Sequence, residues 1–266
     1  MNRLVRSYAA LIRMGLAEAV AYRAQVIIGL TLALVPLIMM AVWLAVVDQV
    51  GPATGWQRAD FIAYYVGAAM IYQFTISFTV WEWQHEIRNG DLSSRLLKPL
   101  DPFHFYLSRR LGRKIFDVLL LTPVVILATL LVPELSFPLT PTRFAALVIS
   151  LLGAFLLSTL MGTVFGMIAF WSTQSANLYL LWFGIGQFLS GWIAPLALFP
   201  DWFSQPAYLL PFHSTLGFPV EILIGRADDQ AIVMGLLLSI FWNVAFAVLY
   251  RLLWRRGLAR YEAVGS

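Results

Sequence analysis

Long apolar stretches alternate with short polar segments along the chain. Six of these stretches are long enough, at about 1.5 Å per residue, to cross the roughly 30 Å hydrocarbon core of a bilayer. They run over 24–47, 61–81, 115–132, 144–171, 176–199 and 231–254. The third is the shortest and holds Asp117, so we expect its helix to begin earlier, as an interfacial segment. The pattern predicts an all-α membrane protein with six transmembrane helices.

Residues 1–23 follow a different pattern. Apolar positions recur there at helical spacing, while Arg3, Arg6 and Arg13 occupy the positions between them. This arrangement predicts an amphipathic helix in the plane of the lipid headgroups. It serves either as a simple anchor for the first span or as part of a partner interface. The remaining residues, 24–266, form the transmembrane domain.

The composition supports a membrane location. Apolar residues make up 60% of the 266 positions, charged residues only 12%, and the mean hydropathy is +0.78. Soluble domains carry about 25% charged residues, so a water-soluble fold and a disordered chain are both excluded. A disulfide scaffold is excluded because there are no cysteines. The basic residues flank apolar stretches instead of forming a nucleic-acid surface.

The positions of Lys and Arg predict the orientation. Fifteen of the 18 lie before the first span, between the second and third spans, or at the end of the sixth span and in the tail. The other side has only Arg58, Arg143 and Arg226. Because basic residues concentrate on the cytoplasmic side, we expect both termini in the cytoplasm and a location in the bacterial cytoplasmic membrane.

The cytoplasmic loop, residues 82–114, predicts a short helix between two long ones. Gly90 suits the position just after a helix end, and Asp91 suits the cap of a new helix. That helix can extend only from Leu92 to about residue 98, because Pro99 stops it. Asp101, followed by proline, marks the start of the next helix.

So short a helix is not stable alone. It places Leu92 and Leu96 on one stripe, with Arg95 and Lys98 beside them. Either it lies on the membrane surface as a loop helix, or it docks a soluble cytoplasmic partner.

The outer segment, residues 195–225, is too apolar for a solvated loop and contains too many prolines for a span. We expect short helices that enter the outer half of the bilayer, where protein or a wet cavity covers their backbone. One of them runs from Pro219 to Ile224 and ends at Gly225, with Pro in its first turn. Glu221 is the only acid in this apolar patch, and it either lines an exit or faces water.

The spans carry no ionisable residue near their middle. A proton- or sodium-coupled transporter needs such a residue as a ligand at depth, so energy from outside the membrane is favoured. In the fourth span, small residues recur every four positions, which predicts close helix packing. They are Ser150, Ala154, Ser158, Gly162 and Gly166. Neither a catalytic set nor metal-ligand spacing occurs.

The chain resembles the ABC-2 type permeases, the membrane subunits of one class of ATP-binding-cassette transporter. The resemblance covers nearly the whole chain and includes the amphipathic N-terminal helix, segments 87–92 and 96–100 of the loop, and segment 210–225. It implies that residues 91–99 form a coupling helix that sits in a cleft of an ATPase subunit. The coupling residues are then Arg88, Gly90, Asp91, Leu92, Arg95, Leu96, Lys98 and Pro99.

The resemblance also implies a dimer of permeases, either homodimer or heterodimer, whose interface encloses the substrate pathway. Spans two and five then face each other, so that Tyr72, Gln73, Trp182 and Gln187 contact substrate and outer helices near Glu221 cap the exit. Hydrogen bonds within one subunit are the alternative for each of these polar residues.

We therefore expect the membrane subunit of an ATP-driven exporter of lipidic or amphipathic cargo. The chain lacks the Gly-x4-Gly-Lys loop that binds nucleotide, so it carries no cofactor of its own, and ATP and Mg²⁺ belong to the partner ATPase. Membrane lipids, and not nucleic acid, are the other expected partner. The alternatives are a secondary transporter or channel and a membrane-embedded enzyme that acts on lipid.

Overall fold

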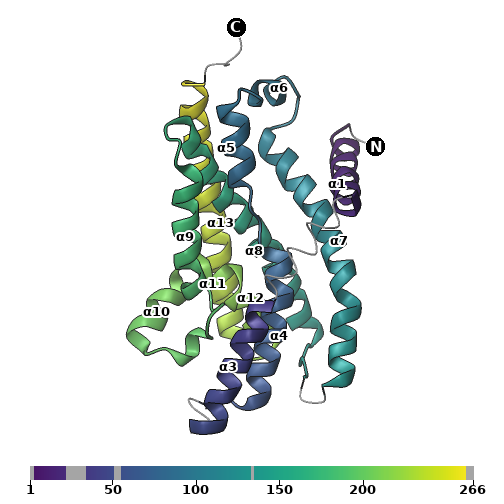
Figure 1. Ribbon diagram of the computed structural model, residues 1–266, viewed down its shortest axis with the longest axis vertical. Coiled ribbons are helices and arrows are strands. Elements are labelled where there is room, and N and C mark those ends of the chain that lie inside the picture. Colours follow the sequence, from purple (N-terminus) through teal and green to yellow (C-terminus); the bar gives the residue numbers. More distant parts are fainter. Residues whose placement is uncertain (1–2, 22–33, 51–54, 133–134, 262–266) are drawn as a thin grey trace.

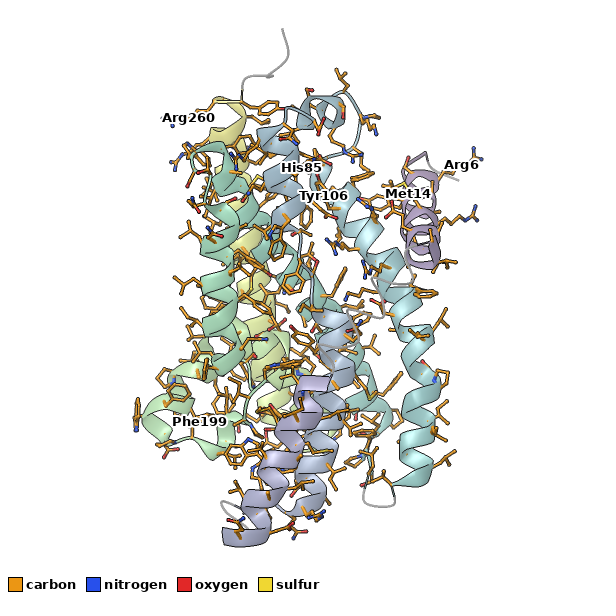
Figure 2. All side chains as sticks on the ribbon, in the orientation of Figure 1. Arg6, Met14, His85, Tyr106, Phe199 and Arg260 are labelled. Atoms are coloured by element: carbon orange, nitrogen blue, oxygen red, sulfur yellow. The ribbon has the colours of Figure 1, made fainter. Side chains whose placement is uncertain are left out.

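The computed structural model describes residues 3–21, 34–50, 55–132 and 135–261. Within these ranges every regular element is a helix and no strand occurs. The long helices run roughly side by side, and the short helix α6 (Leu92–Leu96) lies at one end of the bundle, which we call the α6 end (Figure 1). His85 and Arg260 lie toward this end, and Phe199 lies toward the opposite one (Figure 2).

Helices occupy all six regions of the expected spans. They are α3 (Leu34–Val50), α4 (Arg58–Thr75) with α5 (Val80–Arg88), α7 (Pro102–Leu131), α8 (Pro141–Met167), α9 (Ser175–Leu189) and α13 (Asp229–Leu258). Among the described residues, three stretches are long and apolar enough to cross a membrane, namely Arg58–Arg88, Pro141–Phe170 and Asp229–Leu258. Residues 24–33 of the first expected span lie outside the described ranges. The count of six spans therefore stays a prediction.

The N-terminal element is the expected helix, α1 (Arg3–Ala21), and it packs against the part of α7 nearer the α6 end (Figure 1). Two glycines allow the backbones to meet. A Cβ on Gly15 would lie 2.0 Å from the carbonyl oxygen of Arg109, and one on Gly112 would lie 2.2 Å from that of Ile12. The third span region also begins earlier than its apolar core, as expected, because α7 starts at Pro102.

The fifth span prediction is wrong at its C-terminal end. A helix to Phe199 is expected, but α9 ends at Leu189 and the chain turns at Gly191, whose φ is +89°. The Tyr64 hydroxyl donates a hydrogen bond of 2.8 Å to the Gly191 carbonyl oxygen. A Cβ on Gly191 would lie 2.3 Å from that hydroxyl, so the position requires glycine for both its φ and its space.

The outer segment folds into the short helices α10 (Asp201–Leu209), α11 (Pro211–Thr215) and α12 (Gly217–Leu223). The expected helix at Pro219 exists, but it begins two residues earlier, so Pro219 is its third residue. Every residue of α12 except Glu221 is buried, mainly against α4 and α8. Protein therefore covers this backbone, as its apolar sequence requires.

The small residues of α8 form the predicted packing stripe. Ala154, Gly162 and Gly166 are buried. A Cβ on Gly162 would lie 2.6 Å from the Thr79 hydroxyl, and one on Gly166 would lie 2.5 Å from the Trp83 Cβ. The stripe thus brings the second span region against α8, which positions the features described next.

Candidate functional site

The candidate coupling segment, residues 88–99, reverses the chain between α5 and α7 at the α6 end (Figure 1). Gly90 has a φ of +81°, which fits its predicted place just past the end of α5. The helix α6 extends only from Leu92 to Leu96 and gives way to a turn before Pro99. The predicted capping role of Asp91 is wrong, because its side chain makes no cap hydrogen bond; the hydroxyl of Ser94 donates to its backbone carbonyl oxygen instead, at 2.8 Å.

The predicted start of α7 is confirmed. The backbone amide of Phe103 donates a hydrogen bond of 2.8 Å to the Asp101 carboxylate, with Pro102 as the first helical residue. The same carboxylate accepts a 2.8 Å hydrogen bond from the Tyr250 hydroxyl on α13. Asp101 thus fixes both the beginning of α7 and its position against the last helix.

The chain itself holds α6 in place. Leu92 is fully buried in an apolar cluster that includes Trp83 and Tyr106. The Arg95 guanidinium lies 3.0 Å from the Glu86 carboxylate on α5 and 3.8 Å from the centre of the Phe105 ring on α7. A helix of five residues gains its stability from such contacts and not from its own hydrogen bonds.

These contacts revise the expected docking stripe. Leu92 faces inward and Arg95 is paired within the chain, so neither side chain is free to contact a partner. The exposed apolar side chains are Leu96, 40% exposed, and Leu97, 88% exposed. Four further residues of the predicted set also lie on the exposed face or at the turns beside it. They are Arg88, Asp91, Lys98 and Pro99.

Three of the five predicted pathway residues come together. Tyr72, Trp182 and Gln187 line one cavity of about 60 Å³ between α4, α8, α9 and α11. The Trp182 ring lies 4.5 Å from that of Phe212, and its ring nitrogen is buried without a hydrogen-bond partner. Spans two and five therefore adjoin within a single chain at this point. We call this space the pathway cavity.

The other two predicted pathway residues lie elsewhere. Gln73 lines a separate, apolar cavity on the α7 side of α4, together with Asp117. Glu221 lines neither of these cavities; its carboxylate lies 3.2 Å from the ring of His213, and both side chains are mostly buried. Adjacent positions on α4 thus face two different cavities.

The second span region is interrupted between α4 and α5, at residues 76–79, which the continuous apolar pattern does not predict. Helix α4 ends at Thr75 and Ile76 is extended (φ −62°, ψ 132°). Neither proline nor glycine occurs there. The local signal is a run of Ser, Thr and β-branched residues, whose side chains compete with helical hydrogen bonding.

Side chains from two other helices satisfy the backbone groups at this interruption. The Arg110 guanidinium donates to the Phe78 carbonyl oxygen at 2.6 Å, and the Lys114 ammonium donates to the Gln73 carbonyl oxygen. The Ser77 amide donates to the Ser158 hydroxyl on α8 at 3.1 Å. Because unpaired backbone groups are costly in an apolar region, these partners make the interruption a stable feature.

Within the ranges that the structure describes, no three His, Asp or Glu side chains lie close enough to hold a metal ion. Lys114 and Asp117 form a buried pair near the interruption, with 3.7 Å between the Lys114 Nζ and the Asp117 carboxylate. This pair and the carbonyl cap hold Lys114 in its position.

Comparison with known proteins identifies one family. The sequence model for the ABC-2 family transporter proteins matches residues 32–265 of this chain. None of the curated proteins and none of the solved structures matches. The matched region begins after α1 and includes the coupling segment, both cavities and all the long helices from α4 onward.

Proposed function

This chain belongs to the ABC-2 family of transporter proteins, and we propose that it is the permease subunit of an exporter driven by a separate ATP-binding-cassette ATPase. The observation that carries this proposal is the coupling segment, in which Leu96 and Leu97 are exposed while the buried Leu92 anchors the helix to the rest of the chain. The chain has no nucleotide-binding loop, so ATP and Mg²⁺ would bind to the partner. The excess of Lys and Arg supports placing the α6 end in the cytoplasm, where that ATPase would be.

The contacts around α6 favour transmission of force into the membrane. The Arg95–Glu86 ion pair and the buried Leu92 join α6 to α5, so a displacement of α6 would move α5 with it. The interruption at residues 76–79 separates α5 from α4, which carries Tyr72. It is a place where α5 can change its angle without breaking helical hydrogen bonds. Closure of the ATPase subunits would thus move α5 relative to α4 and switch the helices around the pathway cavity between two packing arrangements.

The size of the pathway cavity supports a second permease subunit. Ligand sites for small molecules usually measure about 300–1,000 Å³, and this cavity measures only about 60 Å³. A lipidic cargo would not fit in the pathway cavity of one chain. The outward surface of α9 next to the cavity is apolar, and a second copy or a homologous chain would complete the pathway against it. Its exposed apolar residues are Leu178, Leu180, Leu181, Ile185 and Phe188.

The lining of the cavity supports an uncharged or amphipathic cargo. The residues around it are aromatic, apolar or neutral and polar, and none is ionisable at neutral pH. The buried ring nitrogen of Trp182 and the buried hydroxyl of Ser190 lack hydrogen-bond partners there, so a cargo with a few acceptor groups would satisfy them.

The buried Lys114–Asp117 pair favours a second candidate, an ion-coupled transporter. Buried ionisable residues in membrane helices often mark proton pathways. Here, however, Lys114 also caps the Gln73 carbonyl oxygen, which gives it a structural role. The two functions differ in their energy source: an ion-coupled protein would transport cargo in vesicles without any ATPase.

Co-purification tests the proposal. The chain is expressed together with the products of its neighbouring genes, extracted in mild detergent and captured by a tag, and any ATPase bound to it is quantified. The double substitution Leu96→Asp and Leu97→Asp should remove the ATPase while membrane insertion stays normal. The control is Ala259→Asp, which adds one negative charge at an exposed position at the C-terminal end of α13. It should retain the ATPase.

Equal ATPase capture by the double aspartate variant and the control would disprove docking at α6. A second arm uses proteoliposomes that contain the permease alone, with a fluorescent lipid as the probe cargo. Transport of this lipid without ATPase and ATP would favour ion coupling and overturn the proposed energy source.

A further inference from the structure

A polar cleft of about 460 Å³ lies between α1, α5 and α7. Three arginines on α7 line it, together with Glu18 on α1 and Glu82 on α5. Gly15 and Ala19 also belong to the α1 wall, beside the point where Gly15 lets the backbones of α1 and α7 meet. The arginines are Arg109, Arg110 and Arg113.

The cleft carries one cation more than its own acids balance. Arg109 lies 2.5 Å from Glu18, and Arg110 lies 3.1 Å from Glu82. Arg113 forms no ion pair with any residue that the structure describes. Burial opposes the charge on Arg109, but the hydrogen bond with Glu18 and the charge of Glu82 outweigh it and raise the pKa of Arg109. An anion would therefore meet a permanently charged cleft with one unpaired guanidinium.

An apolar cavity of about 500 Å³ lies next to it, between α4, α7, α8 and α12. Asp117 lines this cavity and follows Arg113 by four residues, so the two spaces lie on one face of α7, about one helical turn apart. Apolar side chains from α7 and α8 line the cavity, and they are exposed in the isolated chain. They include Val118, Ile126, Val148 and Leu152.

A polar, cationic space followed by an apolar one matches the two halves of a phospholipid. Arginine binds phosphate oxygens through two parallel N–H groups, and basic pockets between helices at the cytoplasmic surface bind anionic headgroups. A soluble phosphate would occupy only the cleft and leave the apolar cavity empty. The single unpaired charge fits a lipid with one net negative charge.

We propose that this groove along α7 binds an anionic glycerophospholipid of the phosphatidylglycerol type as a resident lipid, with its phosphate at Arg113 and one acyl chain in the apolar cavity. The site lies on the opposite side of α4 from the pathway cavity, since Gln73 lines the apolar cavity and Tyr72 the pathway cavity. The lipid is therefore not cargo, and the inference does not depend on the ATPase.

Bound at this place, the lipid would join three elements. Its phosphate would lie beside Arg110, which also caps the Phe78 carbonyl oxygen at the interruption of the second span region. The cleft walls belong to α1, α5 and α7, so the lipid would stabilise the packing of α1 and the position of α5.

Native mass spectrometry of the purified full chain tests the site. The protein is freed of lipid in detergent, and phosphatidylglycerol or phosphatidylcholine is then added back at equal concentration. We expect selective retention of phosphatidylglycerol, and the substitution Arg113→Gln should weaken it by about fivefold, because one basic side chain contributes an interaction of that size near a membrane surface. Arg251→Gln, at an exposed arginine on α13, should retain the lipid like the unsubstituted chain.

A second variant tests the acyl-chain half. Val118→Trp places a large side chain at the exposed wall of the apolar cavity and should reduce retention without changing the arginines. Equal retention of phosphatidylglycerol by Arg113→Gln and Arg251→Gln would overturn the headgroup assignment. If free glycerol 3-phosphate is retained by the protein as well as phosphatidylglycerol is, the ligand is a soluble phosphate and the lipid assignment is wrong. Equal retention of both lipids would overturn the charge argument.

Discussion

Replacement of Leu92 and of Leu97 by alanine should separate the anchoring of α6 from its exposure to a partner. Leu92 is 0% exposed within the apolar cluster beneath α6, and Leu97 is 88% exposed. Removal of a fully buried leucine side chain costs about 2–5 kcal/mol, because transfer energy is lost and a cavity is left. Since α6 has only five residues, we expect this loss to destabilise α6 locally before the whole chain unfolds.

Hydrogen exchange by mass spectrometry measures the effect. The Ser93 amide donates to the Tyr261 hydroxyl at 3.1 Å, so it reports whether α6 is docked. A loss of about 3 kcal/mol corresponds to roughly 100-fold faster opening, since about 1.4 kcal/mol is a factor of ten. In Leu92→Ala the α6 amides should thus exchange hydrogen roughly 100-fold faster. In Leu97→Ala their exchange rates should stay near those of the unsubstituted chain.

Capture of the ATPase gives the complementary result. Leu97→Ala should weaken it although α6 stays docked. Leu92→Ala should weaken ATPase capture only in proportion to the fraction of molecules in which α6 is displaced. Unchanged exchange in Leu92→Ala would refute the anchoring argument, and equal acceleration in both variants would show that Leu97 also packs within the chain.

Three further substitutions test other contacts. Gly15→Leu should separate α1 from α7, because even a Cβ would lie 2.0 Å from the α7 backbone, and protease cleavage of the α1 connection should become faster. Lys114→Met should cost about 3–5 kcal/mol by leaving a buried carboxylate unpaired, and the double variant with Asp117→Leu should recover that share of the lost thermal stability but not the share due to the lost cap on the Gln73 carbonyl oxygen. Asp101→Ala should cost about 1–2 kcal/mol by removing a cap, whereas Asp91→Ala, which loses no cap bond, should leave the melting temperature nearly unchanged.

The sequence predicts well those elements whose signals are local. The turn at Gly90, the start of α7 at Asp101 and the helical character of α1 depend on one residue type or on a periodicity within one segment. The small-residue stripe of α8 is equally readable, since close helix packing needs small side chains at a fixed spacing. Each of these features keeps its predicted place in the structure.

The direction of individual side chains in the candidate site is not predictable in this way. Leu92 and Leu96 lie four positions apart, which suggests that they share one face of the helix. Only Leu92, however, is buried in the aromatic cluster beneath α6. Tyr72 and Gln73 are adjacent and serve cavities on different sides of α4, because Trp182 approaches from one side and α7 from the other. Such choices depend on residues of other helices, whose proximity no single segment reveals.

The interruption of the second span region shows how tertiary contacts override a continuous apolar pattern. An unbroken helix through residues 76–79 would satisfy its own backbone, so the break is stable only because donors meet the freed carbonyl oxygens. Arg110 and Lys114 supply these donors from α7, and Ser158 accepts from the Ser77 amide. Both cations belong to the basic start of the third span region, so residues from which the orientation is predicted are also the ones that cap the second span region.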